Sequence, residues 1–159
     1  MFRNSKSQSE NAKIPLVCEV EGSKYEEYQL YDDHLKRGYF VIRNIPYDRG
    51  ITRESISLYG KTKHNFSKFI EAKIDDRNFQ NPIINEDADR NDYLILVDDK
   101  GNQLHLTGCT CGYSGEGPRG TLEILNKSGF AVNERFVFCA QSFALNHPTI
   151  EKNLYGERL

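Results

Sequence analysis

Tryptophan is absent from this chain, methionine occurs once, and no apolar run approaches the roughly 20 residues that span a membrane. The first 13 residues are polar and lack the apolar segment of a secretory signal. Positive charge is not in excess either: 21 Lys and Arg stand against 23 Asp and Glu, a net charge of −2. These features predict no membrane partner and no broad nucleic-acid surface.

Cysteine is scarce and irregularly spaced, at Cys18, Cys109, Cys111 and Cys139. Such spacing does not form the disulfide framework of a small secreted domain. With no signal segment, we expect a cytoplasmic, reducing setting. The abundance of Asn, Lys, Ile and Asp with little Ala is typical of an AT-rich bacterial or phage genome.

The 159 residues are 38% hydrophobic and 28% charged, which suits one domain with a modest core. We predict a leader over residues 1–12, a single α+β domain over 13–146 and a polar C-terminal tail over 147–159.

Short apolar or alternating runs predict a mostly antiparallel sheet of about five strands with helices packed mainly on one face. Asp98 to Asn102 reads as a hairpin turn, and in the strand after it His105 should point outward. The expected strands cover residues 14–20, 39–45, 93–97, 103–107 and 135–140.

Two other segments favour helices. Ser23 and Glu26 fit a capping box, and the tyrosines behind them share a helical face, which predicts a helix over 24–37. A strand is the alternative there. Residues 51–74 have helical spacing interrupted by Gly60, which predicts two short helices.

The most distinctive stretch is a glycine-rich loop, with five glycines between residues 108 and 120. It leads into a predicted helix over 118–128, because Pro118 suits the first helical position and Gly129 suits the left-handed end. Glycine-rich turns at helix starts present backbone amides to anions. Arg119 would add a charge and Tyr113 a ring that could cover a base.

The leading hypothesis is therefore a small ligand-binding or regulatory protein that holds an anionic or nucleotide-like molecule, without a bound cofactor. A tight structural turn explains the same glycines, and carries equal weight. The candidate ligand-binding residues are Gly112, Tyr113, Ser114, Gly115, Glu116, Gly117, Arg119 and Gly120.

Three of these glycines, Gly115, Gly117 and Gly120, satisfy the dinucleotide pattern G-x-G-x-x-G. The context does not fit it, because residues 109–114 separate the preceding strand from the first glycine. No acidic residue for a ribose follows the next predicted strand near Gln141. We keep only the local anion site.

Two further classes of function stay open. A protein-interaction module, such as an inhibitor or immunity-type protein, could use the loop and the acidic segment 86–92 (Glu86, Asp87, Asp89 and Asp92). A cysteine-dependent enzyme could use Cys109 or Cys111, with His105 as base. The one-residue gap between those cysteines does not favour a zinc site, and no metal is predicted.

Overall fold

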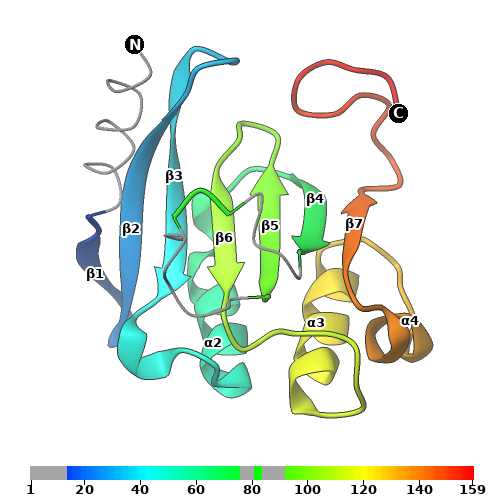
Figure 1. The fold of residues 1–159 in the computed structure, drawn as a ribbon. Helices are drawn as coiled ribbons and strands as arrows, with labels where there is room; N and C mark the ends of the chain where they lie inside the picture. Colours follow the sequence, from blue (N-terminus) through cyan, green and yellow to red (C-terminus); the bar gives the residue numbers. More distant parts are fainter. Residues whose placement is uncertain (1–13, 76–80, 84–91) are drawn as a thin grey trace.

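The computed structural model describes residues 14–75, 81–83 and 92–159, and these form one α+β unit around a single sheet (Figure 1). Seven strands lie in the order β1-β2-β3-β6-β5-β4-β7. The strands are β1 (Leu16–Val20), β2 (Ser23–Asp32), β3 (Arg37–Asn44), β4 (Phe69–Ile74), β5 (Leu94–Asp98), β6 (Gln103–Leu106) and β7 (Phe143–Asn146). The helices are α2 (Thr52–Thr62), α3 (Glu116–Lys127) and α4 (Glu134–Cys139), with 3-10 turns η1 (Pro46–Asp48) and η2 (Lys63–Asn65).

The predicted α+β class is confirmed, but the detail of the sheet is not. The described sheet has seven strands instead of about five, and it is mixed, because β3 and β6 run parallel. After β3 the chain leaves the sheet for α2 and re-enters it at β4, away from β3. It then returns through the β5–β6 hairpin. Such long-range returns are hard to infer from local patterns.

The helix predicted over 24–37 is wrong, and the strand alternative is the observed one. Glu21 and Gly22 both have positive φ, 46° and 80°, and form the two-residue turn between β1 and β2. Positive φ at both positions matches the twist of a hairpin. Glu26 does not cap a helix but forms ion pairs with two arginines on the sheet.

Two other segments also differ from prediction. Residues 69–74, expected in a second short helix, form β4 and pair with both β5 and β7. Residues 135–140, expected as a strand, fall largely in α4. The Asn133 side chain accepts a hydrogen bond from the Phe136 amide at 2.9 Å, which starts this helix. The strand at this sheet edge is β7 instead.

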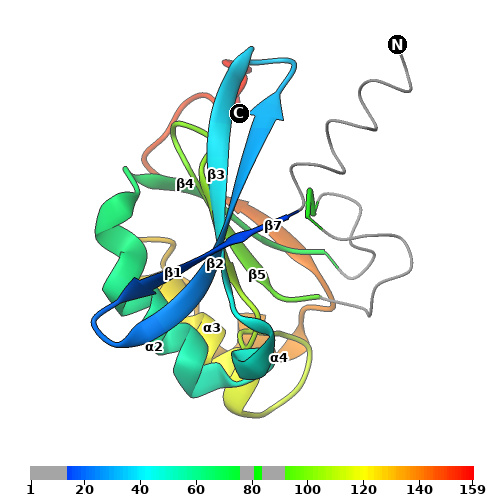
Figure 2. The same cartoon turned by 90° about the vertical axis from the view of Figure 1, so that its left-hand side faces the viewer.

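The face of the sheet toward α2 and α3 is apolar. Figure 2 shows both helices on the same side of the sheet. Ile42, Leu104, Leu96 and Ala72 project from four neighbouring strands and are fully buried there, with Leu125 of α3 in the same cluster. Alternation along each strand places the residues between them on the other side.

We call that other side the front face; it is turned toward the viewer in Figure 1. Strand register aligns two rows of side chains across it. One row runs through Glu26, Arg43, His105, Ile95 and Lys73. The other row runs through Tyr28, Val41, Gln103, Val97, Glu71 and Asn146. The front face is therefore a mixture of charged, amide and apolar groups.

The C-terminal segment, residues 147–159, follows β7 back over part of the front face. Its local pairing joins Lys152 to Arg158, and Leu154 packs against the apolar side chains of β5. In the described ranges no helix has the length and apolar character needed to cross a membrane.

Candidate functional site

A cavity of about 490 Å³ lies on the front face, between the sheet and the C-terminal segment. Gln103, Val97, Glu71 and Asn146 line it, as consecutive members of one cross-strand row. Because four strands supply them, their spacing is set by the sheet itself. The volume is within the roughly 300–1,000 Å³ typical of small-molecule sites.

Residues 153–157 contribute the other wall of the cavity. Leu154 packs on the cluster of Tyr93, Ile95 and Val97. The next residue, Tyr155, donates its hydroxyl hydrogen bond to Asp32 Oδ2 at 3.0 Å. The tail thus connects β7 at one edge of the sheet to the β2–β3 turn near the other.

Asp32 is the anchor of that connection. It also accepts hydrogen bonds at Oδ1 from the His34 and Leu35 amides, at 2.8 and 2.9 Å. Burial by itself would raise the pKa of this carboxyl, but the hydrogen bonds from Leu35, Tyr155 and His34 lower it below the ordinary value. The carboxylate therefore stays ionised at neutral pH beside the cavity.

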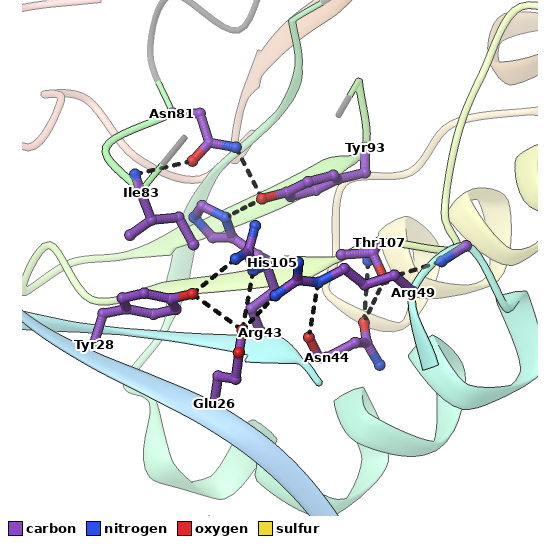
Figure 3. Close-up of polar contacts among 11 residues, drawn as sticks. Glu26, Tyr28, Arg43, Asn44, Arg49, Asn81, Ile83, Tyr93, His105 and Thr107 are labelled. Carbon is purple, nitrogen blue, oxygen red and sulfur yellow. Dashed lines mark hydrogen bonds and ion pairs between the residues drawn. The ribbon is translucent and has the colours of Figure 1, made fainter. Parts of the chain in front are cut away.

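A buried hydrogen-bonded chain starts from Gln103 in the cavity wall, and Figure 3 shows its other members, His105, Tyr93 and Asn81. Gln103 Oε1 lies 2.8 Å from His105 Nε2, and His105 Nδ1 lies 2.8 Å from the Tyr93 hydroxyl. Asn81 Nδ2 donates to the same hydroxyl at 2.8 Å. A carboxamide oxygen only accepts, so the imidazole proton is on Nε2 and Tyr93 donates to Nδ1.

The prediction that His105 is a surface residue is wrong. It does point away from the helices, but Tyr93 and neighbouring strands bury it completely. Burial, together with the nearby charges of Arg43 and Lys73, lowers the pKa of His105 well below 6.5. The neutral ring orients Gln103 through its hydrogen bond. Its complete burial does not suit the role of a catalytic base that would deprotonate Cys109 or Cys111.

A second polar group, built on Glu26, continues this network (Figure 3). Its carboxylate accepts from Arg49 Nη2 at 2.5 Å and from the Tyr28 hydroxyl at 3.0 Å. Arg43 Nη2 donates to Tyr28 at 2.7 Å, and Arg43 Nε lies 3.5 Å from Glu26 as an ion pair. Every charge in this group faces an opposite charge, as burial demands.

The glycine-rich loop lies at the start of α3, away from the front face. Its exposed members are Tyr113, Ser114, Glu116 and Arg119, while Gly117 and Gly120 are buried. The structure thus gathers the predicted ligand residues around one helix turn. No bound group tests them, and the anion site stays a prediction.

Packing explains two of the glycines without a ligand. A Cβ on Gly117 would come within 2.0 Å of Thr110 Oγ1 and 2.6 Å of the Tyr113 hydroxyl. A Cβ on Gly120 would come within 2.5 Å of a methyl group of Thr52, where α3 crosses α2. All three distances are shorter than real contacts allow, so the close packing at these positions favours glycine.

The two side chains proposed to hold a ligand also have protein contacts. Tyr113 folds back to place its hydroxyl 2.9 Å from Thr110 Oγ1, and its ring lies over Gly115. The Arg119 guanidinium lies 5.7 Å from the ring centre of Phe138. A ligand at the helix start would have to fit beside the Tyr113 ring.

The cysteines differ in accessibility. Cys109 is fully buried, and burial raises the pKa of its thiol to about 12, so almost none is thiolate at neutral pH. Cys111 is half-buried and its thiol contacts the Gln141 carbonyl at 3.6 Å. Within the described ranges no three His, Cys, Asp or Glu side chains converge on a point that could hold a metal. Of the acidic segment 86–92, only Asp92 lies within those ranges.

Sequence reasoning missed the cavity, since residues 153–157 were assigned to a polar tail and β4 to a helix. The alternation of FIEAKI in β4 was a usable signal, because it separates Glu71 and Lys73 from Ala72 and Ile74. Comparisons of this chain with protein families, curated proteins and solved structures found no match. The cavity's function must therefore be argued from its own geometry.

Proposed function

We propose that this is a ligand-binding protein whose site is the front-face cavity. The observation that carries the proposal is a 490 Å³ space lined by polar side chains on adjacent strands. Gln103 is held by His105, and Glu71 lies 3.5 Å from Lys73. Groups fixed before a ligand arrives lose little conformational entropy on binding, which favours specific recognition.

A titration followed by backbone amide NMR tests the proposal. The probes are glucose, agmatine, glutarate and inorganic phosphate, which represent neutral, cationic and anionic polar ligands. We expect at least one probe to shift the amides of Gln103 and Asn146 and to lose this effect in Asn146→Tyr, which fills the cavity. Ala144→Tyr is the matched control, since Ala144 is exposed on the same strand and face outside the cavity lining. If none of the four shifts those amides, the cavity proposal fails.

The anionic or nucleotide-like ligand at residues 112–120 is a second candidate. Arg119 in the first turn of α3 and Ser114 just before the helix are both exposed and favour it. ADP in the same titration should then shift the amides of residues 115–119, and Arg119→Ala should abolish the shift. Unchanged spectra in that region would leave the glycines with their packing role alone.

A protein-interaction module is a third candidate, favoured by exposed apolar side chains at the edge strand β1. Ile14, Leu16 and Val17 are 75%, 63% and 67% exposed, and unpaired strand edges recruit partners. A partner recovered from the native host should be lost with Val17→Lys. We also propose a cytoplasmic setting, which the absence of any disulfide among the four cysteines, all described, supports.

A further inference from the structure

We infer that the front-face cavity binds a cationic group, a guanidinium or ammonium ion, rather than an anion. This inference rests on the proposed function and adds the chemical class of the ligand. The charges that line the cavity are three carboxylates, Asp32, Glu71 and Glu157, and one ammonium, Lys73. A ligand that neutralises the excess negative charge has the favourable interaction.

The ammonium of Lys73 does little to reverse this balance. Its Nζ lies 3.5 Å from Glu71 Oε1, on the same strand and face. It is also held near the sheet, with only 11% of its side chain exposed. An anionic ligand would have to compete with that carboxylate for Lys73 and would face Asp32 and Glu157 as well.

The two other carboxylates come from different elements of the fold. Asp32 ends β2, and Glu157 belongs to the C-terminal segment. Asn153 Nδ2 donates to Glu157 Oε1 at 2.7 Å, which positions that carboxylate without neutralising its charge. A carboxylate accepts about four hydrogen bonds, so the lining carboxylates offer acceptors to a guanidinium with its five donors.

Two tyrosines also belong to the lining of the cavity. Tyr39 of β3 and Tyr155 of the tail both line it. Burial, with the charge of Asp32, raises the pKa of Tyr39 to about 12, so the phenol remains neutral. The face of a neutral aromatic ring attracts cations, so these tyrosines can add to the attraction of the carboxylates. Carboxylates and rings together therefore select one class of ligand.

The same chemistry can come from a small amine or from an arginine side chain of another protein. Two probes separate these sources: agmatine, and acetyl-Gly-Arg-Gly-amide, a peptide whose capped termini leave the guanidinium as its only charge. We expect one or both to shift the cavity amides, and binding to weaken about tenfold in Glu157→Gln. Glu157 is exposed on the C-terminal segment, so this change should leave the fold intact. Stronger binding of the peptide would assign the cation to a protein partner.

Glu123→Gln is the matched control, because it removes one carboxylate from the exposed surface of α3, outside the cavity lining. Equal weakening in both variants would show a non-specific charge effect and would overturn the inference. Cavity shifts with glucose, glutarate or phosphate but with neither cation would overturn it too, while the proposed function would stand. No shift with any probe would contradict the proposed function itself.

Discussion

The two faces of the sheet are built from the same strands but differ in chemistry. Behind the sheet, Ile42, Leu96 and Leu104 meet α2 and α3 in a continuous apolar cluster. In front, Arg43, His105 and Gln103 take the alternate positions of two of those strands, where His105 is hydrogen-bonded to Gln103 and Arg43 to Tyr28. Period-two alternation thus divides one set of strands into an apolar and a polar layer.

The difference teaches how the two layers divide their roles. Apolar burial is not directional and contributes most of the stability. A buried polar network contributes little net stability, yet its geometry is specific because every unpaired group is costly. The helix side therefore holds the sheet together, and the front side determines the shape and charge of the cavity.

The sharpest test of this comparison is one substitution made on each face. Leu104→Ala should lower the free energy of unfolding by about 3 kcal/mol, because its fully buried side chain leaves a cavity. Leu30→Ala, at a half-buried front-face position, should lower it by about 1 kcal/mol. Urea denaturation measures both. Equal losses would show that the front face is as important for stability as the helix side.

The second largest effect should come from breaking the front-face ion group. Glu26→Gln keeps the side-chain shape but leaves Arg43 and Arg49 without their carboxylate, which should cost about 2–3 kcal/mol in urea denaturation. Arg49 can reach solvent, since 31% of its side chain is exposed, and this moderates the loss. Glu123→Gln on α3 serves as control and should leave the denaturation midpoint unchanged. A midpoint in Glu26→Gln equal to wild type would contradict the buried network.

Acidification should weaken the front face selectively through His105. Its folded-state pKa lies below the ordinary 6.5, so the unfolded chain binds the extra proton first as the pH falls. The contribution of neutral His105 to the free energy of unfolding is therefore fully present above about pH 6.5. It decreases below that pH by up to about 1.4 kcal/mol per pH unit. His105→Gln should flatten this part of the pH profile of the melting temperature. A profile with the same slope in the variant would assign it to other groups.

The smallest effects should distinguish two glycines in helices. Gly120→Ala should cost about 1–2 kcal/mol, because its Cβ would collide with Thr52 across the α2–α3 contact. Gly60→Ala in α2 should instead stabilise by about 0.5–1 kcal/mol, since apart from the backbone of its own helix and its chain neighbours nothing lies within 4 Å of a Cβ there. Thermal unfolding of both variants measures the pair. Stabilisation by Gly120→Ala would remove the packing explanation and favour a ligand role for that glycine.

Short-range signals in the sequence were sufficient for some elements. The turn before Asn102 was confirmed, with Gly101 at φ 91°, because hairpin chemistry is local. The helix after the glycine loop was confirmed for the same reason, since Phe130 donates back to the Leu125 carbonyl as its terminal glycine predicts. Helical spacing gave wrong predictions for β2 and β4. Both segments form strands because neighbouring strands pair with them on both sides.

The sequence by itself determined the α+β class, the hairpin turn over 98–102 and the helix after the glycine loop, because the turn and the helix ends depend on residues close in the chain. It also marked the loop 112–120, whose anion site remains a prediction. Only the tertiary structure decided the cavity. Asp32, Glu71, Gln103 and Tyr155 are far apart in sequence, and they meet because strand register aligns rows of side chains and the tail folds back over them. That alignment depends on long-range pairing, which no local pattern specifies.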